Sequence, residues 1–127
     1  MSEFSIGILG SVWTVRLSDE KEEKRLEGAG GFTDWTCRLI VVGKMPENSN
    51  LGDPGVFQMK VLRHEIIHAY MFESGLGDDW EHQAIGQEET VVDWFAIQMI
   101  KIYHTVIDAQ SKLSELIDRE KGTDERD

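Results

Sequence analysis

The segment of residues 61–70 constrains the fold most, because it places two histidines and a glutamate inside an apolar run, VLRHEIIHAY. In a helix, His64 and His68 lie one turn apart on the same face, close enough for both imidazoles to reach one ion. Glu65 lies beside that face. Zinc favours tetrahedral coordination by imidazole and carboxylate, and a catalytic zinc site leaves the fourth position to water. The segment therefore predicts a helix whose histidines bind zinc, with Glu65 placed to take a proton from that water.

A catalytic zinc site needs a third protein ligand from elsewhere in the chain, and Glu89 is the best candidate. It stands at the start of a second predicted helix, where Asp93 follows one turn later on the same face. An aspartate in so apolar a stretch needs a buried partner. A zinc-bound histidine supplies one, since its second ring N–H usually donates to a carboxylate. We therefore predict Glu89 as a ligand and Asp93 as the support of a bound histidine.

Other interpretations of these residues stay open at the level of sequence. The two histidines can satisfy local hydrogen bonds without any metal, and an acidic residue at a helix N-terminus is favoured by the helix dipole in any case. Two other residues compete with Glu89 as the third ligand, His82 and Glu88. Asp93 can instead form a buried ion pair with Arg38 or Arg63.

The first third of the chain is predicted to form strands. Residues 4–17 alternate apolar and polar, with a bend or bulge at Gly10 and Ser11. A charge-dense connector follows at 19–27, and then a glycine-rich turn at 28–31. Residues 35–42 are apolar on both sides, which is typical of a strand in the centre of a sheet.

The rest of the chain is predicted to be helical. Asp53 and Pro54 provide an N-cap and a first helical residue, and the first long helix should run to about Ser74, ended by Gly75 or Gly77 in a left-handed conformation. That helix is apolar nearly all round, so we expect it to be buried. A polar connection at 76–86 leads to a second helix from about Gln87, whose part at 91–107 we expect to lie in the core. The end, 118–127, should fray.

These elements predict an α+β fold, in which a small, mostly antiparallel sheet packs on two long helices that carry the zinc site. We expect one domain over residues 1–120 and a charged, frayed tail at 121–127. The net charge of −11 disfavours direct binding of nucleic acid, which depends on Lys and Arg. Cys37 is the only cysteine, so a reducing cytoplasmic setting fits best. Polar residues interrupt the apolar stretch at 91–107, and no signal peptide is evident, so we expect no membrane association.

The motif residues resemble a known group of enzymes. HEIIH followed about twenty residues later by Glu-x-x-x-Asp is similar to the gluzincin arrangement of thermolysin-type peptidases, and the following Phe95–Ala96 resembles the ImmA/IrrE-like metallopeptidases. Small phage-encoded or prophage-encoded proteins of that group share two further segments, here Gly-Phe-Thr-Asp at 31–34, a turn before a strand, and Glu-Ser-Gly-Leu at 73–76. The resemblance covers most of residues 6–107, although the usual Leu-Met-Pro element is missing after Ile100.

The resemblance implies a zinc-dependent metallopeptidase that hydrolyses peptide bonds in a polypeptide, for example a regulatory protein such as a repressor. It assigns zinc binding to His64, His68 and Glu89, the general base to Glu65, and support of a bound histidine to Asp93. For the group that stabilises the oxyanion we prefer His82, with three other candidates, Tyr70, Tyr103 and His104. The alternative function is a zinc-stabilised, catalytically inactive phage or prophage module for regulation or assembly. A phage-encoded protein would act in the host cytoplasm.

Overall fold

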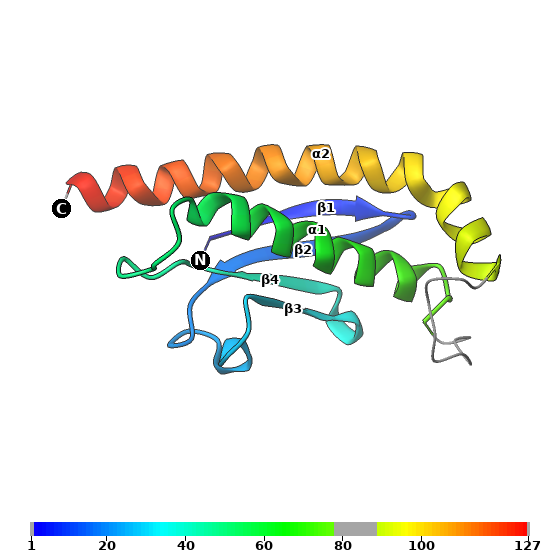
Figure 1. Cartoon of the computed structure of the whole chain (residues 1–127), viewed down its shortest axis with the longest axis horizontal. Coiled ribbons are helices and arrows are strands. Elements are labelled where there is room, and N and C mark those ends of the chain that lie inside the picture. The colour runs from blue at the N-terminus through cyan, green and yellow to red at the C-terminus, as the bar shows by residue number, and fades with distance from the viewer. Residues whose placement is uncertain (1, 78–88, 127) are drawn as a thin grey trace.

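The fold is α+β, a four-stranded mixed sheet packed against two helices, and the computed structural model describes residues 2–77 and 89–126 (Figure 1). The strands occur in the order β1-β2-β4-β3, and two of the three pairings are antiparallel while β2 and β4 run parallel. The expected fold class is thus confirmed at this level. The elements are β1 (Ser2–Ile8), β2 (Ser11–Ser18), β3 (Gly31–Asp34), β4 (Leu39–Gly43), α1 (Pro54–Glu73) and α2 (Glu89–Arg126).

The bend predicted at Gly10 and Ser11 is the tight turn of a β-hairpin rather than a bulge. Leu9 and Gly10 both have positive φ, at 50° and 87°, and Ile8 pairs directly with Ser11. Two consecutive residues with positive φ match the right-handed twist of the flanking strands, which is why such turns are common in hairpins. The segment predicted at 4–17 is therefore two paired strands, β1 and β2.

The strand predicted at 35–42 is wrong in its first half. Trp35–Cys37 forms a 3-10 turn, η2, in which the Asp34 carboxylate accepts from the Thr36 backbone N–H, and Arg38 ends the turn with φ of 52°. Only Leu39–Gly43 is extended, and it occupies the central position predicted for it, between β2 and β3. Gly31–Asp34, the segment that resembled a turn, is instead the edge strand β3. Four residues that include a glycine are too short to show an alternating pattern.

The main core lies between one face of the sheet and both helices. Burying a large aliphatic or aromatic side chain stabilises the fold by about 1.5–3 kcal/mol, so this layer dominates the stability. A smaller cluster on the opposite face joins β4 to the connector before β3 through Leu26, Leu39 and Val41. The main core contains Ile6, Ile8, Trp13, Val15, Leu17, Ile40 and Val42 from the sheet, Leu62, Ile66, Ala69 and Tyr70 from α1, and Ile102, Ala109, Leu113 and Leu116 from α2.

Helix α1 begins and ends as predicted but is buried on one side only. Pro54 is the first helical residue, and Gly75 follows the C-cap with φ of 83°. The buried residues are spaced by three and four, Gln58, Leu62, Glu65, Ile66, Ala69 and Tyr70. Val56 on the other side is 64% exposed. The expectation of a helix buried all round is therefore wrong, because apolar composition does not show which face meets the core.

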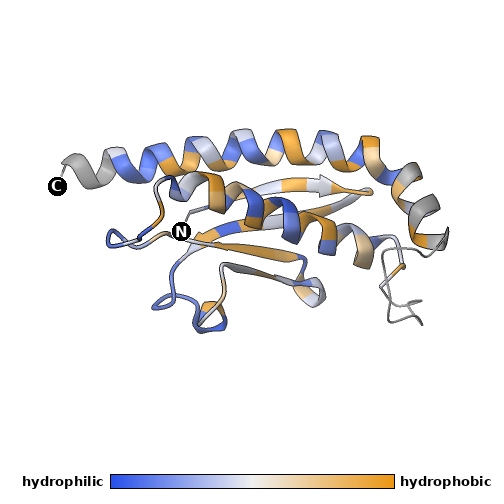
Figure 2. Cartoon of the chain, viewed as in Figure 1, coloured by the Kyte–Doolittle hydropathy of each residue, from blue (hydrophilic) through white to orange (hydrophobic). Residues whose placement is uncertain are grey.

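Helix α2 is 38 residues long, about 57 Å at 1.5 Å per residue. Its first half is less buried than predicted for 91–107, although apolar residues are concentrated there (Figure 2). The exposed apolar side chains are Phe95, Ile97, Met99, Ile100, Tyr103 and Ile107. Helical backbone continues to Arg126, into the segment that we expected to fray. Over the part of the chain that the structure describes, no helix is long and apolar enough to cross a membrane.

Candidate metal centre on α1

The two motif histidines face each other on the exposed side of α1. The Nε2 atoms of His64 and His68 lie 3.1 Å apart, so one ring can donate its N–H to the other. The centroids of the two rings are 4.8 Å apart, and the ring planes meet at an angle of 70°. A tetrahedral zinc with Zn–N bonds of about 2.0–2.1 Å holds two nitrogens roughly 3.3–3.4 Å apart. The two imidazoles therefore converge with nearly the spacing that zinc requires, as the helical spacing predicted.

Glu65 lies next to this pair but projects into the interface between α1 and β3. It is only 7% exposed. Its Oε1 accepts a hydrogen bond of 2.8 Å from Thr33 Oγ1, and its backbone oxygen lies 3.2 Å from the same hydroxyl. A buried carboxylate is costly unless a donor satisfies it, so this contact is a requirement of the fold as well as a feature of the site. The sequence predicted the role of Glu65 but not its partner.

A shallow hollow of about 150 Å³ adjoins both groups. Its wall is mainly apolar, and Lys60 is its one cationic lining residue. Gly30 leaves room there: a Cβ on this residue would lie 3.1 Å from Phe57 Cζ and from Val61 Cγ2. The lining residues are Gly30, Gly31, Phe57, Lys60, Val61, His64 and Glu65. A small apolar group bound there would lie beside the imidazole of His64.

The predicted third ligand is placed only by its backbone. Glu89 opens α2 and Asp93 follows one turn later, but the structure describes neither side chain. His82 and Glu88 lie outside the described residues. Among the side chains that are described, no group of three or more His, Cys, Asp or Glu is placed to hold a metal ion. The structure thus brings His64 and His68 together, places Glu65 beside His64 at one hollow, and leaves the ligand role of Glu89 as a prediction.

The register of the two helices sets a condition on that prediction. The helices run antiparallel, Glu89 lies five residues before Trp94 in the chain, and His68 lies six residues before Ser74. Measured from the contact of Trp94 with Ser74, Glu89 and His68 are therefore displaced in opposite directions along the helices, by about 7–8 Å and 9 Å. Three contacts fix this register, Arg63 to Gln110 (2.7 Å), the Tyr70 hydroxyl to the Lys101 carbonyl (3.1 Å) and Trp94 Nε1 to Ser74 Oγ (2.9 Å). Coordination by Glu89 therefore requires the first turns of α2, which curve in Figure 1, to bend over the C-terminal end of α1.

The alternative partners considered for these residues have other contacts. Arg38 binds Glu73, with 2.5 Å between Nε and Oε1, and Arg63 donates to Gln110. The hydroxyl of Tyr70, a candidate for oxyanion stabilisation, is bound between the helices to the Lys101 carbonyl and to Thr105. Tyr70 is buried in the core, so it does not serve the exposed imidazole pair. Tyr103 and His104 are exposed on α2.

The C-terminal end of α1 is anchored by Glu73, a contact that the sequence did not reveal. Its carboxylate accepts from Trp13 Nε1 at 2.8 Å, from Ser11 Oγ at 3.2 Å and from Arg38. Burial opposes ionisation of this carboxyl, but the three donors outweigh it, so the pKa of Glu73 lies below its ordinary value. Two of the donors, Ser11 and Trp13, lie on β2, and the third, Arg38, lies at the end of η2. They therefore tie the last turn of α1 to the sheet.

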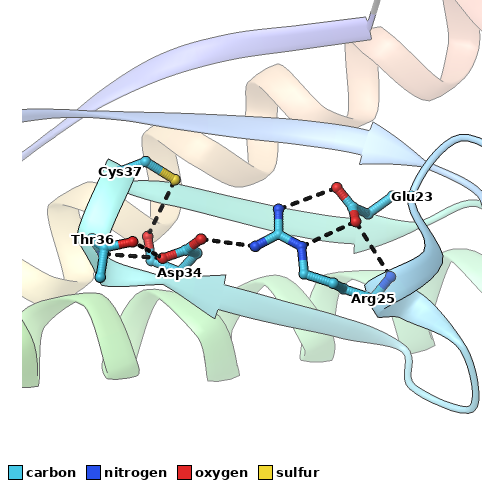
Figure 3. Close-up of polar contacts among 5 residues, drawn as sticks. All are labelled: Glu23, Arg25, Asp34, Thr36 and Cys37. Carbon is cyan, nitrogen blue, oxygen red and sulfur yellow. Dashed lines mark hydrogen bonds and ion pairs between the residues drawn. The ribbon is translucent and has the colours of Figure 1, made fainter.

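The far end of β3 is anchored by a second polar cluster (Figure 3). Arg25 bridges Glu23 and Asp34, with 2.7 Å between its Nη1 and Asp34 Oδ2, so the charged connector at 19–27 makes specific contacts with β3. Hydrogen bonding from the Thr36 hydroxyl, and next from Arg25, lowers the pKa of the Asp34 carboxyl to about 2. Arg25 also lies 4.5 Å from the ring centre of Phe32. These contacts hold β3 at the edge of the sheet.

Comparison of the chain with protein-family models, with curated proteins and with solved structures finds no match. Function is therefore inferred from the chemistry of the site itself. The relevant features are the converging imidazoles of His64 and His68, the buried carboxylate of Glu65, and the edge strand that contacts it.

Proposed function

We propose that this protein is a zinc-dependent metallopeptidase of the gluzincin type, similar to the ImmA/IrrE-like enzymes, which hydrolyses peptide bonds in a polypeptide. The observation that carries the proposal is the imidazole pair, whose Nε2 atoms converge to 3.1 Å on an exposed helix face. Helical spacing brings the two rings together, and a metal is favoured because their nitrogens then converge to nearly the spacing of two ligands on a tetrahedral zinc. A carboxylate on the next residue, Glu65, supplies the base that hydrolysis needs.

In the proposed site His64, His68 and Glu89 hold the metal, and Asp93 supports one of the imidazoles. Zinc, when bound, supplies Lewis-acid activation of a water molecule and of the peptide carbonyl. Glu65 takes the proton from the attacking water and later delivers it to the leaving amine nitrogen. The shallow hollow beside His64 and Glu65 receives a small apolar group of the substrate.

The two edges of the sheet differ in a way that supports a peptide substrate. At the β1 edge, side chains of α2 occupy backbone acceptors: Lys112 Nζ donates to the Ser5 carbonyl at 3.1 Å, and Thr105 Oγ1 to the Gly7 carbonyl at 3.4 Å. At the β3 edge no further strand pairs with β3 and neither α1 nor α2 lies beyond it in the described part of the chain, although the 3-10 helix at Lys24–Leu26 contacts β3 (Figure 1). An uncovered edge can add an extended peptide as a further strand.

The pairing of β3 with β4 identifies the groups that such a peptide would meet. Gly43 N–H donates to the Gly30 carbonyl, and bonded and non-bonded pairs alternate along an antiparallel ladder. Gly31 and Thr33 therefore direct their N–H and C=O groups to the open edge, where no further strand of the described residues pairs with β3. Because the Thr33 side chain contacts Glu65, a peptide added at this edge would pass beside the proposed base.

The test separates metal binding from catalysis. Glu65→Gln keeps the side-chain oxygen that accepts from Thr33, so we expect it to fold and bind one zinc per chain while hydrolysis falls by about 10²–10⁴-fold. His64→Ala and Glu89→Gln should lose the zinc as well. Zinc content by atomic emission and cleavage of denatured casein measure the two properties. Glu115→Gln, at an exposed site on α2, is the matched control and should behave as wild type.

The same experiment tests the rival function, a zinc-stabilised binding module without catalysis. The burial of Glu65 against β3 favours it, because a carboxylate held there also serves the packing of α1 on the sheet. This rival predicts stoichiometric zinc in the wild type and no cleavage that depends on Glu65. Turnover by Glu65→Gln at the wild-type rate would overturn the peptidase mechanism, and absence of zinc from the purified wild type would overturn both functions.

A further inference from the structure

We propose that Thr33 is a positioning residue for catalysis, which holds the Glu65 carboxylate in register with a substrate bound at the β3 edge. This role rests on the proposed function. The bond from Thr33 Oγ1 to Glu65 Oε1 is 2.8 Å long and joins two elements that are 32 residues apart in the chain. In the described part of the structure it is the one side-chain hydrogen bond that Glu65 makes.

The Thr33 hydroxyl constrains the carboxylate in a way that suits a base. A hydroxyl has a single proton to donate, and here the acceptors within reach are Glu65 Oε1 and, at 3.2 Å, the Glu65 backbone oxygen. Both acceptors belong to one residue, so the hydroxyl fixes the side chain relative to its own helix turn. The second carboxylate oxygen has no hydrogen-bond partner among the described residues and remains able to accept a proton.

The close approach of β3 to α1 depends on Gly31, two residues before Thr33 on the same face of the strand. A Cβ at position 31 would lie 2.6 Å from Val61 Cγ1 and 2.6 Å from the Val41 carbonyl oxygen, so no side chain fits there. The missing side chain lets the strand come near enough for the Thr33 hydroxyl to reach Glu65. Phe32, on the opposite face, packs with the smaller cluster around Leu39 and Val41.

Thr33 also faces the open edge with its backbone. Its N–H and C=O are among the groups that would pair with an added strand, while its side chain holds the base. One residue therefore fixes both the substrate backbone and the proton acceptor. A misplacement of about 1 Å between reacting groups can cost a hundredfold in rate, so a shared anchor is a direct means of keeping the two in register.

Thr33→Val tests this role, because valine keeps the shape of threonine and lacks the hydroxyl, whereas Thr33→Ser keeps the hydroxyl. We expect kcat for casein-derived fluorogenic peptides to fall about 10–100-fold in Thr33→Val with KM within about twofold, and to recover to within about threefold of wild type in Thr33→Ser. Thr14→Val, a half-buried threonine of β2 outside the site, is the matched control. Rates are referred to folded, zinc-loaded protein, with zinc affinity and the urea midpoint measured for each variant.

A double-mutant cycle with Glu65→Gln adds a readout that loss of stability alone would not give. If Thr33 acts through the Glu65 carboxylate, Thr33→Val should lower the residual rate of Glu65→Gln by less than twofold. An unchanged kcat in Thr33→Val, or an equal loss in Thr33→Ser, would overturn the positioning role while leaving the peptidase standing. Absence of cleavage by the wild type would instead overturn the proposed function, and the positioning role with it.

Discussion

Gly31→Ala should destabilise the protein by forcing β3 away from α1. An alanine Cβ would lie 2.6 Å from the Val41 carbonyl oxygen and from Val61 Cγ1, whereas ordinary contact begins at 3.4 Å. The strand must therefore retreat by about 0.8 Å, and the carbonyl cannot rotate aside because it belongs to the central strand β4. Overpacking of this kind costs about 1–3 kcal/mol, and the lower chain entropy of unfolded alanine returns about 0.5–1 kcal/mol. We expect a net loss of about 1–2 kcal/mol.

Urea unfolding followed by circular dichroism measures this loss. With an m-value of about 2 kcal/mol/M, the midpoint should fall by roughly 0.5–1 M. Gly7→Ala is the matched control, since Gly7 also lies in an edge strand and a Cβ there meets no atom within 4 Å. A midpoint for Gly31→Ala equal to or above that of Gly7→Ala would refute the close approach of β3 to α1. It would also remove the basis for the Thr33 contact with Glu65.

Two further predictions concern the contacts that anchor the ends of β3 and α1. The pKa of Asp34 is lowered from 3.8 to about 2 in the folded protein. The contribution of this carboxylate to stability is therefore complete above about pH 4 and is lost as the pH falls toward 2. Over this range the urea midpoint of Asp34→Asn should decline less than that of wild type. Glu73→Gln, which removes the charge facing Arg38, should cost about 1 kcal/mol at pH 7, because Arg38 is half exposed and solvent weakens the pair. An unchanged urea midpoint relative to Glu115→Gln would contradict this.

Local signals in the sequence predicted helix α1 and both of its ends. Asp53 and Pro54 mark the start of α1 and Gly75 its end, because each sets a backbone conformation by itself. The convergence of His64 and His68 follows from helical geometry alone, since residues four apart are neighbours on one face. These features need no knowledge of the rest of the fold, which is why sequence sufficed for them.

Features that depend on packing between distant segments were not predictable in this way. β3 has four residues and exists because it pairs with β4, so its own pattern carries little information. The first half of α2 is as apolar as a core helix, yet α1 and the sheet cover only one side of it and leave Phe95 and Ile100 exposed. The partner of Glu65 is 32 residues away and lies in the strand that the sequence did not reveal.

The geometry of the candidate site is set largely by residues outside the HEIIH motif. Glu73 ties the end of α1 to the sheet, and Asp34 with Arg25 ties the end of β3 to the connector before it. Between these anchors Gly31 sets how closely strand and helix approach, and that distance decides whether Thr33 reaches Glu65. The HEIIH motif supplies the reactive groups, whereas the contacts of Glu73 and of Asp34 with Arg25 determine the positions of those groups. Substitutions at the anchors should therefore alter the rate of a site whose own residues are intact, through the same contact that Thr33→Val removes.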